Sequence, residues 1–438
     1  MKYLLFIFLG LMGSQYLSAQ FSATGGIGIP YEYNKNIVGT GLSKVFVFNT
    51  FNNATLTYKS NSPNVQFYRY ETSKADKDTI SVPKPGIQRS GSFTYEISNL
   101  KDSRGYIASD GIQEVAVWVI NYAQHQPTLN SIAPVEADDK CESLKLLIDK
   151  SDELSYYTPN GIKNKVDRLY SISYQTQEWD DANHKFVNKT ERLENLNIGT
   201  EKNITPPLRS TQFTLKGDQF GDHFGIAKEV SSSEYEAISV KGEITTEQRT
   251  RDELNEKERP TEDKLGGSAP ITITFYGHGN DNVEFYTWTI YRGADQTNPI
   301  ARYTDQEFTY EFTEGGNFNY KVVLEVADQT SSCIDTASVS FTVSESYLDI
   351  PNYFSPGDSP GSNDEFRVAY KSLVQFKCTI FNRWGVKLYE WSDPAKGWDG
   401  KYKGKYVNTG VYFYVIEATG SEGKKYKEAG DINILRSR

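Results

Sequence analysis

The chain has 438 residues, of which 30 are Tyr and 23 are Phe but only 2 are Met, and its formal net charge is −10. This length exceeds what a single core sustains, so we expect two to four domains, and the aromatic, Met-poor composition favours β-strands over helices. The segment from Tyr347 to the end carries 14 Lys and Arg against 11 Asp and Glu, a charge of +3, so the preceding part carries −13. Such an acidic body disfavours nucleic acid and anionic lipid as partners, because phosphate contacts need clustered Lys and Arg.

The first twenty residues have the pattern of a secretory signal peptide. Met1-Lys2-Tyr3 gives a positive start, an apolar run follows from Leu4 to Met12, and Ala19 is a small residue at the expected cleavage point. The apolar run is too short to span a bilayer, and no later segment reaches 18 consecutive apolar residues. We therefore expect residues 1–19 to be removed and no membrane-spanning helix to follow.

Residues 20–128 alternate in short bursts that are separated by clusters of Asn, Gly, Pro and Asp. The bursts include Val45-Phe46-Val47-Phe48, Phe67-Tyr68-Arg69-Tyr70 and the apolar run around Trp118. This pattern predicts a β-sandwich domain whose central strand carries Trp118 into the core.

Residues 129–267 predict a second, less regular β-rich domain. The segment from Trp179 to Phe186 has the composition of a hairpin tip, between strands that contain Tyr174 and Val187. Residues 245–264 are almost wholly polar and charged, which indicates an exposed loop or an interdomain linker.

Three cysteines allow one disulfide at most. Cys378 alternates with Phe376 and Ile380 along an expected strand, which favours a core position. If any pair forms, the sequence favours Cys141 with Cys333, which come from different expected domains.

Residues 268–346 contain strand bursts centred on Trp288, followed by Val322-Val323-Leu324-Glu325-Val326-Ala327-Asp328. The segment resembles a PKD-type immunoglobulin-like domain. That resemblance implies a spacer or interaction module without catalytic activity.

Residues 347–438 contain about seven short expected strands, which predict a small immunoglobulin-like sandwich. Five motifs occur in order: Ile350-Pro351-Asn352-Tyr353-Phe354-Ser355-Pro356, Asn382-Arg383-Trp384-Gly385, Gly397-Trp398-Asp399-Gly400, Gly410-Val411-Tyr412-Phe413-Tyr414 and Gly430-Asp431-Ile432-Asn433-Ile434-Leu435-Arg436. The segment resembles the gliding-motility-associated C-terminal domain, the type B sorting domain of the type IX secretion system of Bacteroidota. The resemblance implies export through the periplasm to the cell surface, docking on an outer-membrane barrel of the PorP/SprF type, and retention there or release.

Two interpretations stay open for the tryptophan and aspartate residues in the motifs of this terminal segment. Trp384, Trp398 and Asp399 are candidates for recognition by the secretion machinery, but packed indoles and an Asp-capped turn explain the same pattern. Arg383 is a candidate bidentate donor to a partner or to a nearby carbonyl.

A calcium loop is a further candidate in the same segment. Asp358, Asn363 and Asp364 supply the hard oxygen ligands that calcium prefers. Ser359-Pro360 interrupts the loop that the related domains carry there, and no other cofactor is indicated.

The sequence shows no catalytic signature. The four histidines, His125, His184, His223 and His278, are scattered, and there is no zinc spacing, nucleophile elbow, phosphate loop or dinucleotide fingerprint. Acidic clusters such as Asp138-Asp139 are typical of solvated loops, while Trp179 and the strand Phe67-Tyr68-Arg69-Tyr70 offer rings that can stack on sugars.

The sequence thus predicts an all-β protein of tandem immunoglobulin-like β-sandwich domains. We expect a non-enzymatic protein at the cell surface or outside the cell, acting as an adhesin or interaction stalk towards an unknown glycan or protein ligand. Two alternatives remain: a component or sensor of the secretion or gliding apparatus, and an exported hydrolase with its site in residues 130–267.

Overall fold

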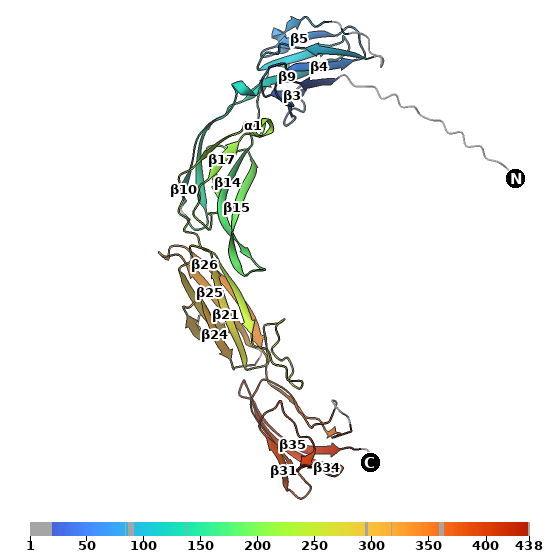
Figure 1. The fold of residues 1–438 in the computed structure, drawn as a ribbon, viewed down its shortest axis with the longest axis vertical. Helices are drawn as coiled ribbons and strands as arrows, with labels where there is room; N and C mark the ends of the chain where they lie inside the picture. Colours follow the sequence, from blue (N-terminus) through green and yellow to red (C-terminus); the bar gives the residue numbers. More distant parts are fainter. Residues whose placement is uncertain are drawn as a thin grey trace, which may run out of the picture.

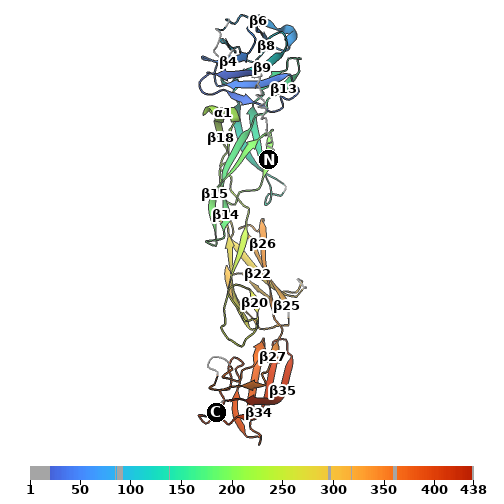
Figure 2. The ribbon, with the colours of Figure 1, turned by 90° about the vertical axis from the view of Figure 1, so that its right-hand side faces the viewer.

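The computed structural model describes residues 20–83, 85, 92–137, 139–293, 297–316, 318–358 and 363–436, so the expected signal peptide lies outside the described residues. The described chain is built almost entirely of β-strands, which confirms the expected fold class. Four domains follow one another in a slightly curved rod, with the first domain and the C-terminal domain at opposite ends (Figure 1). A view turned by 90° shows the same four domains in line (Figure 2). Within the described residues, no helix is both long and apolar enough to cross a membrane.

The first domain contains the elements β1 (Gln20–Thr24), β2 (Tyr31–Tyr33), β3 (Leu42–Phe48), β4 (Thr55–Ser60), β5 (Gln66–Tyr70), η1 (Lys74–Asp76), β6 (Asp78–Ile80), β7 (Phe93–Ile97), β8 (Arg104–Ser109), β9 (Glu114–Asn121) and η2 (Tyr122–Gln124). Its six-stranded sheet has the order β2-β3-β9-β8-β5-β6, and a three-stranded sheet β1-β4-β7 covers one face. Central strand β9 is buried on both faces, because both its odd and its even positions are apolar.

The second domain contains β10 (Thr128–Glu136), β11 (Leu144–Ser151), β12 (Ser155–Tyr157), β13 (Lys163–Lys165), β14 (Tyr170–Asp180), β15 (Lys185–Leu196), β16 (Glu201–Ile204), β17 (Thr214–Gly217), α1 (Gln219–Phe224) and β18 (Lys228–Ser231). The sheets β10-β11-β16 and β15-β14-β17-β18 enclose a core that includes Leu146, Ile172 and Phe213. Strands β14 and β15 form the expected hairpin. Asp180 closes its turn by accepting hydrogen bonds from the backbone N–H groups of Ala182 and Asn183.

Parts of the second domain complete the core of the first. Trp118 and Tyr70, on the second face of the six-stranded sheet, belong to one core cluster with Tyr156 from β12 and Phe220 from α1. Residues on both sides of the expected boundary at residue 128 therefore contribute to one core. The apolar run around Trp118 predicts a strand that is buried on both faces, but it does not show which later segment of the chain covers the second face.

A buried ion pair of the second domain is also hydrogen-bonded to the first domain. Arg168 Nη1 lies 2.6 Å from Asp218 Oδ2, and the two side chains are 2% and 0% exposed. The other oxygen of Asp218 accepts hydrogen bonds from the hydroxyl of Tyr122 and from the N–H of Gly221, while Arg168 donates to the carbonyl of His125. Removing either charge would leave its partner buried and unpaired, which is strongly destabilising.

The third domain contains β19 (Gly242–Gln248), β20 (Gly266–Gly267), β21 (Ile271–Gly279), β22 (Phe285–Arg292), β23 (Ala301–Tyr303), β24 (Glu307–Phe312), β25 (Phe318–Ala327) and β26 (Ile334–Val343). The sheets β19-β21-β24 and β20-β26-β25-β22-β23 enclose Trp288, Phe275 and Leu324.

The structure differs from the sequence expectation at the start of this domain. Residues 245–248, assigned to a loop or linker, belong to strand β19, which pairs with β21 over its whole length. The β-branched run Ile244-Thr245-Thr246 favours a strand, and the charged residues that follow it concealed this signal. The expected boundary at residue 267 therefore lies too late in the chain.

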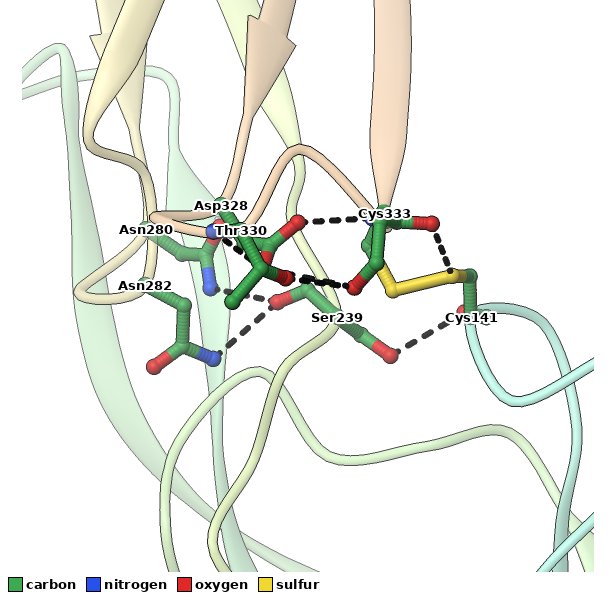
Figure 3. Close-up of a disulfide and its surroundings, with 8 residues drawn as sticks. Cys141, Ser239, Asn280, Asn282, Asp328, Thr330 and Cys333 are labelled. Atoms are coloured by element: carbon green, nitrogen blue, oxygen red, sulfur yellow. Dashed lines mark hydrogen bonds between the residues drawn. A yellow bond between two sulfur atoms is a disulfide. The ribbon is translucent and has the colours of Figure 1, made fainter.

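The second and third domains are joined by a disulfide between Cys141 and Cys333, whose Cα atoms lie 5.4 Å apart (Figure 3). Beside it, the side-chain amides of Asn280 and Asn282 donate to the carbonyl of Ser239, at 3.0 Å each. The disulfide and these hydrogen bonds thus fix the short connection between these domains.

Asp328 positions the loop that carries Cys333. Its carboxylate accepts hydrogen bonds from the N–H of Cys333, at 2.6 Å, and from the N–H of Thr330, at 3.0 Å. Burial alone would raise the pKa of Asp328, but these hydrogen bonds outweigh burial and lower the pKa to about 2. The carboxylate is therefore charged over the ordinary pH range and holds the loop in place.

The C-terminal domain contains β27 (Tyr347–Asp349), β28 (Tyr353–Phe354), β29 (Ala369–Lys371), β30 (Leu373–Phe381), β31 (Lys387–Trp391), β32 (Lys401–Tyr402), β33 (Lys405–Tyr406), β34 (Gly410–Gly420) and β35 (Lys425–Ile434). Its main sheet has the order β28-β35-β34-β30-β31, and two-stranded sheets β27-β29 and β32-β33 accompany it. The core includes Phe366, Trp398, Ile416 and Cys378, so Cys378 occupies the core position expected from its alternation.

Candidate functional site

The turn between β30 and β31 presents an arginine and a tryptophan together. The side-chain oxygen of Asn382 accepts hydrogen bonds from the N–H groups of Trp384 and Val386, at 3.0 Å each, which closes the turn. Trp384 is 77% exposed, and the guanidinium carbon of Arg383 lies 5.2 Å from the centre of its ring. Trp384 is therefore not a core residue, and the pair forms a cation–π contact at the surface.

Strand β34 adds an apolar surface next to this turn. Val411, Phe413 and Val415 point away from the core and are 45%, 43% and 43% exposed, while the alternate residues of the strand point inward. In the neighbouring strand, Phe381 lies opposite Phe413, directly before the turn that carries Arg383 and Trp384. We call Phe381, Val411, Phe413 and Val415 the open face.

Trp398 and Asp399, the other two recognition candidates, serve the fold. Trp398 is fully buried, packs against Phe354, and donates from Nε1 to the carbonyl of Lys401, at 2.9 Å. Asp399 accepts hydrogen bonds from the N–H of Lys401, at 3.0 Å, and from its ammonium group, at 2.9 Å. Packing and turn closure account for both residues, as one of the two interpretations expected.

The candidate calcium residues lie around a loop whose residues 359–362 are outside the described part of the chain. Asp364 accepts a hydrogen bond from the N–H of Gly357, at 3.1 Å, and the carbonyl of Asn363 accepts one from the N–H of Ser355, at 2.8 Å. Asp358 lies in the turn between them. Over the described ranges, no three His, Cys, Asp or Glu residues are grouped to hold a metal ion, so calcium here stays a prediction.

The aromatic candidates for sugar stacking are engaged in packing. Trp179 contacts His278 of the third domain, with ring centres 5.1 Å apart, and Phe186 of its own hairpin, at 5.4 Å. Tyr68 is covered by the ammonium group of Lys77, 4.1 Å from the ring centre, and Phe67 and Tyr70 are buried. Trp179 thus contributes to the junction between domains.

One cluster in the first domain has the residue types of a hydrolase triad but not the geometry. Asp102 Oδ2 and Ser103 Oγ both approach the same nitrogen, Nε2 of His125, at 2.7 and 3.3 Å. A triad needs the carboxylate on one ring nitrogen and the nucleophile on the other. Burial would raise the pKa of Asp102, but hydrogen bonds from His125 and from the N–H of Asn121 lower it, as in a structural contact.

The open face was missed by the sequence analysis, although the sequence carries a signal for it. From Val411 to Ile416 every residue is apolar or aromatic. A strand with two apolar faces, in a domain too small for a second layer on each side, leaves one face exposed. Exposed apolar patches next to Trp and Arg are typical of protein interfaces.

Two family models match parts of the chain. The model of the CHU_C type IX secretion signal domain matches residues 348–434, and that of the fibronectin type III domain matches residues 133–232. The C-terminal domain is therefore a type IX secretion signal domain, as its resemblance indicated, and an immunoglobulin-like domain lies upstream. The signal domain implies export to the cell surface or the extracellular space.

No curated protein matches the chain. A solved structure described as a Ca2+-stabilized adhesin that helps an Antarctic bacterium reach out and bind ice is 9% identical, with a TM-score of 0.20, over 88% of this chain and 94% of that chain. A likeness of this degree carries no argument about this protein.

Proposed function

We propose that the chain is a non-enzymatic stalk that is exported by the type IX secretion system and presents its N-terminal end away from its docking end. The observation that carries this proposal is the placement of the secretion signal domain and the first domain at opposite ends of the rod (Figure 1). An adhesin or interaction stalk needs such a separation between anchor and ligand surface.

The junctions between domains support the role of a spacer. The first two domains share a core, and the buried ion pair of the second domain is hydrogen-bonded to Tyr122 and His125 of the first. A disulfide ties the second domain to the third. Domain pairs that are linked in this way bend less than domains on a single flexible linker. A stiff rod keeps its two ends apart.

We further propose that Arg383, Trp384 and the open face dock on the secretion machinery or on an outer-membrane barrel of the PorP/SprF type. Arg and Trp are enriched among the residues that contribute most to binding at protein interfaces, and the positive charge of the C-terminal domain distinguishes it from the acidic body. Both properties suit a docking surface for an acidic protein partner.

Deletion of residues 347–438 tests the proposal. The truncated chain should remain in the periplasm, where protease added outside the cell cannot reach it, while the full chain should be cleaved. Delivery of the truncated chain to the surface would show that export does not depend on this domain.

A component or sensor of the secretion or gliding apparatus is the second candidate. The exposed Arg383 and Trp384 pair, which lies at the docking end, favours it. Two measurements separate the candidates. If the chain belongs to the apparatus, cross-linking from position 384 should recover a barrel, and cells that lack the protein should still adhere. Reduced adhesion of cells that lack the protein would support the stalk.

A further inference from the structure

A loop of the third domain reaches onto the secretion signal domain. It leaves β19 after Gln248 and returns to the sheet at Gly266, where the buried side chain of Gln248 both accepts a hydrogen bond from the N–H of Gly266 and donates to the carbonyls of Thr261 and Lys264. Both ends of the loop are thus fixed in the third domain. We call its central residues 255–258 the strap.

An ion pair holds the strap in position. Arg251 contacts Glu256 through two bonds, Nη2 to Oε1 at 2.6 Å and Nε to Oε2 at 3.0 Å, and the side chain of Glu256 is 1% exposed. Arg251 also donates to the carbonyl of Ser268, at 2.7 Å, and to that of Pro270. A bidentate, shielded pair of this kind gives the strap a defined geometry.

The strap pairs with β29 of the C-terminal domain. The N–H of Lys257 donates to the carbonyl of Tyr370, at 2.7 Å, and the N–H of Tyr370 donates to the carbonyl of Asn255, at 3.1 Å. These bonds form a parallel bridge between Glu256 and Tyr370. The strap therefore adds a short strand to the small sheet β27-β29.

Side chains extend the same contact. The amide of Asn255 donates to the carbonyls of Val368 and Pro394, at 2.8 Å each. Glu258 Oε1 lies 2.9 Å from the ammonium group of Lys371, and Ser344 donates to the other oxygen of Glu258. Hydrogen bonds from Ser344 and Lys371 lower the pKa of Glu258, which keeps it charged.

A second set of buried contacts lies beside the strap. Ser372 is fully buried; its hydroxyl accepts from the N–H of Ala269, at 2.9 Å, and donates to the carbonyl of Ser344, at 2.8 Å. Its N–H donates to the hydroxyl of Ser268, at 2.8 Å. Buried polar groups that satisfy one another in this way are costly to separate.

We propose that the strap makes the secretion signal domain a docked structural part of the stalk, so that the domain stays bound to the third domain after the chain between them is cut. The covalent connection, residues 344–346, is short, and Glu345 is its exposed residue. A cut after Glu345 leaves Ser344 on the piece that contains the third domain, so the contacts of the strap and of Ser372 do not depend on an intact connection. Proteolytic processing at this point would therefore leave the stalk attached to its docking domain.

A nicking experiment on the full chain tests the inference. A recognition sequence for a specific protease is inserted after Glu345, the purified protein is cut, and the two pieces are followed by size-exclusion chromatography at decreasing concentration. The pieces should elute together. Separation of the cut wild-type pieces at micromolar concentration would overturn the inference.

Variants of the strap show whether the strap keeps the cut pieces together. The double variant Asn255→Ala, Glu258→Ala removes two side-chain hydrogen bonds and one ion pair between the cut pieces, and should speed their dissociation by about tenfold or more. Glu262→Ala, at an exposed position of the same loop, is the matched control and should dissociate as the wild type does. If the cut pieces of the double variant and of the control dissociate at the same rate, the strap does not hold the two pieces together. Delivery to the surface is not measured, so this result is independent of the proposed function.

Discussion

Cys141 of the second domain is bonded to Cys333 of the third, 192 residues further along the chain. The bond lies beside the short connection around Ser239, to which Asn280 and Asn282 donate their hydrogen bonds (Figure 3). The disulfide is therefore a second link at a place where the chain itself crosses only once.

We predict that Cys141→Ser, Cys333→Ser increases bending at this junction without unfolding either domain. Each domain keeps the aromatic and aliphatic residues of its own core, from which the change removes only Cys333 of the third domain, and the asparagine hydrogen bonds remain. Small-angle X-ray scattering should give a smaller radius of gyration and a broader distance distribution, while the melting transitions stay close to those of the wild type. Unchanged scattering would show that the disulfide does not stiffen the rod.

The shared core of the first two domains predicts that they unfold together. Phe220 of α1 is fully buried and lies 5.1 Å from Tyr31, between ring centres. Phe220→Ala should destabilise both domains by about 3 to 5 kcal/mol, because it leaves a cavity in that core. Ile226→Ala, at a 38% exposed position, should change stability by less than about 0.5 kcal/mol. Calorimetry that gave the first and second domains separate transitions, with only one of these two shifted, would contradict a shared core.

The hairpin contact between the second and third domains should depend on pH. His278 faces Trp179 and His184 of the hairpin, donates to or accepts from Thr245, and lies opposite Glu243 in the sheet. Burial, and then the nearby His184, lower the pKa of His278 below its usual 6.5.

Because the unfolded chain binds the proton more readily, this contact is fully stabilising above pH 6.5 and weakens as the pH falls towards the lowered pKa. An NMR titration should give His278 a pKa below 6.5, and His184→Gln should raise it. A pKa of His278 at or above the usual value would show that the contact does not form in solution.

The two tryptophan motifs of the C-terminal domain should behave differently on mutation. Trp398→Ala removes a fully buried indole and should destabilise the domain by about 3 to 5 kcal/mol. Trp384→Ala removes an exposed one and should cost less than about 0.5 kcal/mol. Hydrogen exchange of β30 and β34 in increasing urea measures both. Equal losses of stability in the two variants would contradict a buried Trp398 and an exposed Trp384.

The sequence predicted individual strands and turns better than it predicted which segments pack against them. Alternation identified the β class, the hairpin around Trp179 and the core position of Cys378, because those signals are local. It did not identify β19, since charged neighbours concealed Ile244-Thr245-Thr246, or the cover over Trp118, which comes from Tyr156 and Phe220. The motifs of Trp384 and Trp398 favoured packing for both rings, but Trp384 is exposed, since only the packed domain decides which ring faces inward.

The central claim is that Arg383, Trp384 and the open face deliver the stalk to the surface, and a variant that alters this surface without unfolding the domain tests it. Trp384→Ser, Phe413→Ser should leave the melting temperature nearly unchanged and reduce surface exposure, measured by external protease on intact cells, by about tenfold or more. Val374→Ser, at a 49% exposed position at the other end of β30, is the control and should reach the surface normally. Normal delivery of the folded double variant would contradict the claim.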